Sequence, residues 1–288
     1  MLLLPKLRIH NANALSSAYT IGFPAMTAWL GLAHALQRGL AEKFPCKFAG
    51  VGVVSHDFNL QTYKGVRDFD SSIIGMASPL KRDGKRASFI EEPRCHLTVS
   101  LMIEYEALSF EEAPEYEIVE LISKLLNSRL KFAGGDLMSH GKPERMIISD
   151  ENKFKILKRK LMPGFLLRER RDLMIKSMEK EEGDALDSLL SYLSVHSSCD
   201  VVDEKVSWQR IRREKGWIVP IAVGFQGITP LGAAENQRDA DTPHRFAESI
   251  ITLGEFVVPY RLESVDEMLW RYHVNADKSQ YVCSQQVI

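Results

Sequence analysis

The spacing of the apolar residues in the first 140 positions constrains the fold more than any other feature of this sequence. Leu7 and Ile9 alternate with polar residues across positions 6–11, as in a strand with one buried face. From Pro24 to Leu40 the apolar residues, Trp29 and Leu36 among them, recur at helical spacing, so we expect both side chains in the core. The remaining predicted elements here are strands at 48–58 and 95–105 and a helix at 115–130. The order is therefore strand, helix, strand, strand, helix.

Loop signals separate these elements. Small polar residues fill positions 11–17, and Gly134 and Gly135 follow the second helix. Between the second and third strands, positions 63–93 are polar and carry basic residues on both sides of Asp83-Gly84. Because Asp-Gly is a strong tight-turn signal, we predict a protruding hairpin with a basic tip, although a solvated loop would have the same composition.

The second half of the chain has a less regular pattern. We predict a basic helix at 151–161, a strand at 165–168, a helix at 172–196 with an exposed acidic stretch, a strand at 217–225 and a helix at 242–254. Pro220 lacks an N–H donor, so the strand at 217–225 is expected at a sheet edge or a bulge. With no repeat or low-complexity linker in between, we expect residues 1–140 to form a core with an insertion at about 63–94, and residues 141–288 to pack on it.

The composition excludes several classes of protein. Lys and Arg total 37 and Asp and Glu 38, so the formal net charge is −1 and the whole-chain basicity of many nucleic-acid binders is missing. With 45% hydrophobic residues the chain is not expected to be disordered, and no stretch approaches the roughly 20 apolar residues of a membrane helix. The first residues lack the pattern of a secretory signal peptide. The four widely spaced cysteines argue against a disulfide scaffold or thiolate metal site and favour the reducing cytoplasm.

Sequence signals for catalysis are weak. The eight histidines form no H-E-x-x-H motif, and no G-x-S-x-G or Walker loop is present, so we predict no catalytic residue, metal or cofactor. One alternative stays open, because His10 at the first strand and His34 on the first helix would suit an acid–base pair for RNA cleavage.

Local clusters of cations are a stronger signal than the histidines. Residues 153–171 hold eight Lys or Arg side chains against one acid, and Arg210 and Arg212 follow near Trp208 and Trp217. Such patches offer phosphate sites, and nearby aromatic rings offer faces on which unpaired bases stack. Solvated helix faces would have the same composition.

Several long segments resemble a known family. They are LLLPKLRIHNANALSSAYTIGFPAMTAWLGLAHALQR, FAGVGVVSHDF, PLKRDGKRASFIEEPRCHLTVSL, AGGDL, LMPGFLLRERRDL, GWIVPIAVGFQGITPL and DTPHRFAESIITLGEFVVPYR, in order from Leu2 to about Arg261. These segments are similar to the Cas-five-type, or Csy-two, subunits of type I-F CRISPR surveillance (Csy, or Cascade) complexes. The tail beyond Arg261 and the acidic stretch near Glu181 are not matched.

The resemblance implies a fold and a function. The fold is the α+β fold of the RAMP superfamily: a ferredoxin-like, RNA-recognition-motif-like core, which the predicted element order also fits, with a thumb-like hairpin insertion and a mixed α/β C-terminal half. The function is that of a non-catalytic subunit that binds the 5′ handle of the guide RNA (crRNA), pairs with the large subunit and contacts the first backbone subunit. Target DNA would be met indirectly, through the assembled complex, in cytoplasmic antiviral defence. Since Cas-five proteins of another subtype cleave repeat RNA, a metal-independent repeat endoribonuclease is the alternative.

The resemblance also assigns RNA-binding residues. Asn11, Asn13, Ser16 and Ser17 match the family's opening motif, and their amides and hydroxyls suit the open edges of splayed bases, although a self-capped turn is the other interpretation. The other predicted RNA contacts are Arg8 on the first strand, Lys81, Arg82, Lys85 and Arg86 in the thumb region, Gly134 and Gly135 in a glycine-rich loop, Arg159, Arg168 and Arg170 in the basic segments, and His244 and Arg245 at a helix start.

Overall fold

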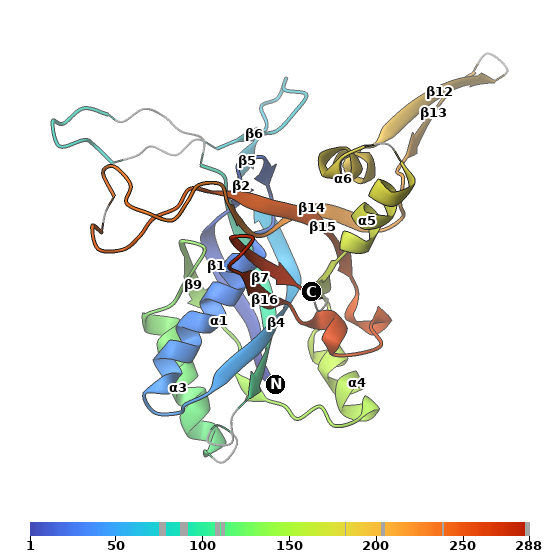
Figure 1. Cartoon of the computed structure of the whole chain (residues 1–288). Helices are drawn as coiled ribbons and strands as arrows, with labels where there is room; N and C mark the ends of the chain where they lie inside the picture. Colours follow the sequence, from blue (N-terminus) through green and yellow to red (C-terminus); the bar gives the residue numbers. More distant parts are fainter. Residues whose placement is uncertain are drawn as a thin grey trace.

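A large antiparallel sheet runs through the molecule, and its strands come from both halves of the chain (Figure 1). The computed structural model describes residues 1–74, 79–86, 92–106, 110, 113–181, 183–202, 205–237 and 239–285. The strand order is β16-β17-β14-β15-β11-β4-β7-β1-β9-β8, and β10 also pairs with β1. The strands from the first half are β1 (Leu2–Asn13), β4 (Lys47–Leu60), β7 (Arg94–Glu106), β8 (Lys131–Phe132) and β9 (Gly135–Ser139). The others are β10 (Glu144–Arg145), β11 (Phe165–Glu169), β14 (Trp217–Gly227), β15 (Ala247–Val257), β16 (Arg271–Asn275) and β17 (Gln280–Ser284).

Two helices, α1 (Met26–Ala41) and α3 (Glu115–Ser128), cover one face of this sheet and confirm the predicted β-α-β-β-α order. Leu7 and Ile9 of β1 pack with Trp29 and Leu36 of α1 in a single core, as expected. The α1 helix begins two residues after Pro24, with Ala25 at its N-cap. The fold is therefore α+β, as the sequence predicted.

Two bulges keep β1 aligned with this core. Lys6 and Asn11 have φ angles of 52° and 56°, and the register with β7 shifts at both positions. Each bulge adds one residue, so the apolar side chains before and after it face the same side of the sheet. The exposed N–H groups are satisfied by β7, where the Lys6 N–H donates to the Ser100 hydroxyl and the Asn11 N–H to His96 Nδ1 (3.0 and 3.1 Å).

The predicted loop at 11–17 is wrong in its first part. The first strand continues to Asn13, and β2 (Leu15–Ser17) then pairs with β3 (Thr20–Ile21) in a small hairpin. Small polar residues signalled an irregular segment, but the bulges and the short hairpin give them regular hydrogen-bonded partners.

Over β1, β4 and β7, the other face of the sheet is covered at one end by α4 (Glu151–Lys160). Phe154 and Leu157 of this helix pack on Leu3, Val54 and Met102, which point away from the first core. This confirms the basic helix predicted at 151–161, whose apolar side faces the sheet. Beyond α4, towards the end of β1, the same face presents polar side chains.

The helix predicted at 172–196 is wrong as a single element. It is divided into α5 (Arg171–Lys180) and α6 (Ala185–Leu193), and β12 (His196–Val202) follows, paired with β13 (Lys205–Ile211) in a protruding ribbon (Figure 1). Asp184 accepts hydrogen bonds from the backbone N–H groups of Leu186 and Asp187 and begins α6 with a capping box. The acidic stretch therefore contains a helix start instead of one continuous exposed face.

The helix predicted at 242–254 is also wrong. Ala247–Val257 forms β15, which pairs with β14 on one side and β11 on the other. Ile250 and Leu253 have helical spacing to Phe246, but the β-branched run around them suits a strand once two partners are present. The expectation for Pro220 is confirmed. Pro220 lies in the part of β14 that pairs with β15 but not with β17, so this part is a sheet edge, and a bulge follows between Ala222 and Gly224. Two short 3₁₀ turns, η1 (Pro259–Arg261) and η2 (Asp266–Met268), lead into the last strands.

The predicted insertion begins with a short hairpin of β5 (Thr62–Tyr63) and β6 (Ser72–Ile73). Its basic tip is a tight turn in which the Lys81 N–H donates to the Lys85 carbonyl and the Gly84 N–H to the Lys81 carbonyl (both 2.9 Å). Gly84 has a φ of 77°, as the Asp-Gly signal predicted. The parts of the insertion at 75–78 and 87–91 lie outside the described residues.

Candidate nucleic-acid interface

A polar groove occupies the open end of the sheet, on the face that α4 leaves uncovered. It encloses about 250 Å³ and is lined by Arg8, Ile9, His10, Asp57, Asn59, His96, Leu97 and Thr98. Arg8 on β1 lies opposite Thr98 on β7, and Thr98 lies opposite Asp57 on β4. The Arg8 side chain is exposed, and no hydrogen bond or ion pair joins it to another described residue. A cation that is exposed and unpaired in this way can attract an anionic ligand.

Two imidazole rings form a flat surface in this groove. The rings of His10 and His96 stack with their centroids 4.6 Å apart and an interplanar angle of 29°. Because His96 Nδ1 accepts a hydrogen bond from the Asn11 N–H, the neutral ring carries its proton on Nε2. A base that is not stacked on its neighbours can pack on such a pair.

The glycine-rich turn lies directly beside the groove. Ala133 and Gly134, with φ of 45° and 77°, form the tight turn between β8 and β9, and the Asn13 N–H donates to the Ala133 carbonyl (2.9 Å). A Cβ on Gly135 would lie 2.6 Å from the His10 carbonyl oxygen, so this position requires glycine. The structure therefore brings Arg8, Asn11 and Asn13 together with Gly134 and Gly135.

Three residues of the predicted RNA-binding loop are engaged within the fold. The Asn13 side chain accepts from the Leu15 N–H and donates to the Leu15 carbonyl (3.1 and 3.0 Å). The hydroxyls of Ser16 and Ser17 both hydrogen bond to Thr20 Oγ1 (2.8 and 2.7 Å). These contacts are those of a self-capped turn, the other interpretation considered from the sequence, whereas the Asn11 side chain is exposed.

Arg168 and Arg170 are paired with a buried carboxylate away from the groove. Glu255 Oε2 accepts from Arg168 (2.9 Å) and from Arg170 (2.6 Å), and the Glu255 side chain is only 8% exposed. Arg170 also pairs with Asp172 (3.1 Å). The structure does not bring these two arginines together with the groove residues, and their phosphate-binding role stays a prediction.

The other predicted contacts lie on separate surfaces. Arg159 is exposed in the last turn of α4, and Lys81, Arg82, Lys85 and Arg86 are exposed around the tight turn of the insertion. His244 and Arg245 lie in the connection between β14 and β15 instead of at a helix start, where His244 and Gly232 form an isolated bridge.

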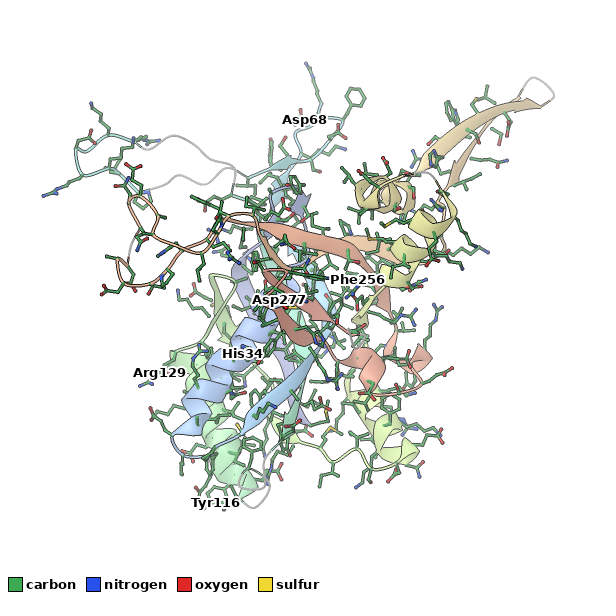
Figure 2. The ribbon with its side chains drawn as sticks, viewed as in Figure 1. His34, Asp68, Tyr116, Arg129, Phe256 and Asp277 are labelled. Carbon is green, nitrogen blue, oxygen red and sulfur yellow. The ribbon has the colours of Figure 1, made fainter. Side chains whose placement is uncertain are left out.

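His96 and Arg94 were not predicted from the sequence as part of the interface, and His10 was considered only for RNA cleavage. Arg94 pairs with Glu92 (2.7 Å) and lies beside Gly134, whose added Cβ would be 3.7 Å from the arginine Nη1. Their signal in the sequence is the alternation along the first and third predicted strands, because outward residues of paired strands share one face. His34 lies on α1 (Figure 2), its ring edge against Tyr272 (centroids 5.0 Å apart), and therefore on the opposite side of the sheet from His10. The acid–base pair considered from the sequence is not assembled.

A chain of hydrogen bonds connects β1 and β7 to β4 and to the segment after α4. The Ser100 hydroxyl accepts from the Lys6 N–H and donates to His56 Nε2 (2.7 Å), and His56 Nδ1 donates to the Pro163 carbonyl (2.5 Å). Burial lowers the pKa of His56, the nearby Lys6 charge adds to this lowering, and the bond to Pro163 opposes it. His56 thus links β4 to β7 and to the segment after α4.

Within the described residues no three His, Cys, Asp or Glu side chains could together hold a metal ion, and no described helix is long and apolar enough to cross a membrane. The family model described as CRISPR-associated protein (Cas_Csy2) matches residues 2–283. The CRISPR-associated protein Csy2 of Pseudomonas aeruginosa (strain UCBPP-PA14) is 33% identical over 308 aligned positions, which cover 98% of this chain and 94% of the relative.

Proposed function

The chain belongs to the Csy2 family of CRISPR-associated proteins, and from that premise we propose that it is a non-catalytic subunit of a type I-F RNA-guided surveillance complex that binds the 5′ handle of the guide RNA. The observation that carries the proposal is the groove in which Arg8, the His10–His96 pair, Asn11 and the turn at Gly134 converge. A cation for phosphate, flat rings for a base and an amide for a base edge are the groups that single-stranded RNA recognition uses.

Binding would combine two kinds of contact. The Arg8 guanidinium would take a phosphate, and the turn at Gly134, which has no side chain, would let the RNA backbone approach closely. The rings of His10 and His96 and the amide of Asn11 would contact bases whose edges are open. Exposed cations on the insertion and Arg159 on α4 would extend the electrostatic attraction along the RNA.

The strand order supports a ferredoxin-like, RNA-recognition-motif-like core of the RAMP type. Strands β9, β1, β7 and β4 are neighbours in that order, all antiparallel, with α1 and α3 on one face. This is the arrangement of the β-α-β-β-α-β unit, whose open face is left for a ligand. In this proposal residues 1–140 form the core, the insertion at about 63–94 is the thumb, and residues 141–288 pack on the core.

The proposed protein partners are the large subunit and the first backbone subunit, with target DNA met through the assembled complex in the cytoplasm. The ribbon of β12 and β13 supports a protein contact, because Trp208, Val206 and Ile211 on it are 68%, 62% and 56% exposed. A two-stranded ribbon is only marginally stable alone, so apolar residues exposed along it suit a partner surface.

The test is recovery of the chain, co-expressed with the other subunits and a repeat–spacer RNA. We expect an intact complex whose RNA keeps its handle, and a large loss of recovered complex when the handle sequence is scrambled. Assembly that is indifferent to RNA would contradict handle binding and leave only a protein-interaction subunit.

The second candidate, a metal-independent repeat endoribonuclease, is favoured by one observation, the stacked His10–His96 pair beside Arg8. Incubating precursor RNA with the purified chain tests it, with His10→Ala and His96→Ala as variants. Cleavage that both variants abolish would replace the scaffold proposal, whereas uncut RNA supports it.

A further inference from the structure

The face of the sheet that carries the polar groove also carries α4, and the surface between them is basic. On β7, the side chains of Thr98, Ser100 and Met102 follow one another on this face. Thr98 lies opposite Arg8 in the groove, and Met102 packs under α4. Four steps along a strand span about 13 Å, so the groove and the helix are neighbours on one surface.

Lys6 lies between the groove and α4. Its N–H donates to the Ser100 hydroxyl, and its charge adds to the lowering of the pKa of His56, whose ring is hydrogen-bonded to Ser100. The Lys6 ammonium therefore lies near His56 on this face. The side chain is exposed, and within the described residues its ammonium forms no hydrogen bond or ion pair.

Lys142 brings a second cation to the same place. It follows Gly141, whose N–H donates to the carbonyl of Pro5, the residue before Lys6 (2.7 Å). A Cβ on Gly141 would lie 2.9 Å from the Pro5 ring, so the two segments are in close contact. The Lys142 side chain is exposed, and no described carboxylate pairs with it. Two unpaired ammonium groups therefore lie on neighbouring segments.

Arg159 adds a third cation, from α4. It is exposed in the last turn of the helix, the end from which the chain returns to contact His56. Lys160 beside it pairs with Glu144 (2.6 Å), whereas Arg159 has no carboxylate partner in the part of the chain that the structure describes. The fold therefore leaves this charge available to a ligand.

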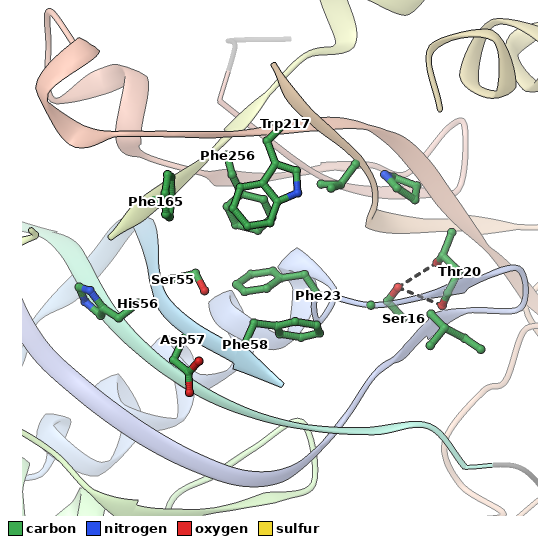
Figure 3. Close-up of a pocket in the computed structure, with 14 residues that line it drawn as sticks. Ser16, Thr20, Phe23, Ser55, His56, Asp57, Phe58, Phe165, Trp217 and Phe256 are labelled. Atoms are coloured by element: carbon green, nitrogen blue, oxygen red, sulfur yellow. Dashed lines mark hydrogen bonds between the residues drawn. The ribbon is translucent and has the colours of Figure 1, made fainter. Parts of the chain in front are cut away.

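These three cations, Lys6, Lys142 and Arg159, form a basic track that offers charge but no place for a base. Beneath it, both ring nitrogens of His56 are hydrogen-bonded and Ser100 is buried. A large aromatic cavity of about 410 Å³ opens on the opposite face of the sheet (Figure 3). It is lined by Phe23, Phe58, Phe165, Trp217 and Phe256, among others.

A ligand on the basic track is therefore held through its phosphates. Duplex DNA is such a ligand, because its bases are paired inside and its two strands together carry one negative charge per about 1.7 Å of helix axis. Contacts of this kind position a duplex without reading its sequence.

The place of the track beside the groove also favours the target duplex. In the proposed function the groove holds the handle, and the guide pairs with target DNA from the end of the handle onward. The DNA that flanks the paired segment stays double-stranded, so it lies next to the subunit that holds the handle. The track starts two residues from Arg8, at the border of the groove.

We propose that the basic track binds the phosphate backbone of the target DNA duplex where this duplex flanks the segment paired with the guide. The inference rests on the proposed function, which leaves target DNA to the rest of the assembled complex, and it adds a direct contact from this chain. Arg159 would then attract RNA from a distance and contact DNA directly.

The experiment uses the full chain assembled with its partner subunits and a guide RNA. The track variant combines Lys6→Gln, Lys142→Gln and Arg159→Gln. The matched control, which removes three exposed cations on the side of α1 and α3, combines Arg38→Gln, Lys124→Gln and Arg129→Gln. In the track variant the affinity for duplex target DNA should fall roughly 100-fold, about fivefold for each lost contact. The slope of log affinity against log salt should fall by about 2.7, or about 0.9 for each contact, and the control should bind as the wild type does.

Two comparisons test whether the effect belongs to the duplex. A single DNA strand that covers only the segment complementary to the guide should bind the track variant and the wild type equally. A charge-conserving variant, Lys6→Arg with Lys142→Arg and Arg159→Lys, should restore duplex binding. An equal loss for the single strand, an equal loss in the matched control, or no restoration by the charge-conserving variant would each overturn the inference.

The remaining outcomes separate this inference from the function beneath it. If the track variant loses guide RNA, the track is an RNA contact, so the inference is wrong and handle binding stands. If it loses partner subunits equally with and without RNA, the track is a protein contact and the inference is again wrong. A wild type that is indifferent to the handle sequence would remove the proposed function itself.

Discussion

Two regions of this molecule carry arginines on strands but place them in opposite surroundings. In the groove, Arg8 lies on an exposed strand face, and no described residue pairs with it. On β11 and just after it, Arg168 and Arg170 share the buried carboxylate of Glu255, and a Cβ on Gly216 would lie 2.5 Å from that carboxylate. A run of cations in a sequence therefore does not show whether those cations bind a ligand. A carboxylate some 85 residues away can form an ion pair with them inside the fold.

The same contrast applies to the histidines. His10 and His96 stack on each other in the groove, whereas both ring nitrogens of His56 are hydrogen-bonded inside the fold. Side chains that the fold leaves exposed can serve a ligand, and side chains that it has already paired contribute to stability. The predictions below test this division.

The largest expected effect is that of Glu255→Gln. Removing this buried charge leaves Arg168 and Arg170 without their shared partner, and breaking a buried ion pair costs about 3 kcal/mol or more in unfolding free energy. Urea denaturation measures the loss, with Glu248→Gln, an exposed residue of the same strand, as control. An unchanged midpoint for Glu255→Gln would show that the arginines do not depend on this carboxylate.

Arg8→Gln should have a smaller effect, which changes the affinity for guide RNA and leaves the stability of the fold nearly unchanged. Loss of one phosphate contact should weaken guide RNA binding about fivefold and lower the slope of log affinity against log salt by about 0.7, the value for single strands. The unfolding free energy should change by less than about 0.5 kcal/mol. Salt-dependent binding assays check this, with Arg129→Gln, an exposed arginine that follows α3, as control. Equal losses of affinity in Arg8→Gln and Arg129→Gln would assign the effect to net charge and not to the groove.

The sequence predicted the first half of the fold well because local patterns decide it. The apolar faces of α1 and α3, the β-branched run of β4 and the alternation in β7 can each be recognised within one element, and Asp83-Gly84 specifies its own turn. It failed at 242–254, where the run around Ile250 follows a helical stripe locally but gains two strand partners from distant segments. A short window of the sequence does not show such pairing, because the partner strands lie far away along the chain.

The candidate site was predictable only in part for the same reason. The position of Arg8 follows from alternation along one strand, and Gly134 from its place after a helix. The His10–His96 stack depends on the register between β1 and β7, which the bulges at Lys6 and Asn11 set. The cavity lined by Phe23, Phe58, Phe165, Trp217 and Phe256 depends on segments that are far apart in the sequence and meet only in the folded chain.

The smallest effect expected is a pH dependence of stability that arises at His56. Its folded pKa is lowered, mainly by burial, from the usual 6.5, so the folded state binds a proton less readily than the unfolded state. The stabilisation is therefore complete above the unfolded pKa and is lost as the pH falls through the folded pKa. Unfolding free energies at about pH 8 and about pH 5 should show a larger loss for the wild type than for His56→Gln, which cannot titrate. The control is His10→Gln, because it removes an imidazole from the groove without touching the chain from Ser100 to Pro163. If His56→Gln and the wild type lose equal stability on acidification, the fold does not lower the pKa of His56. The contrast between hydrogen-bonded His56 and the stacked histidines of the groove would then not hold.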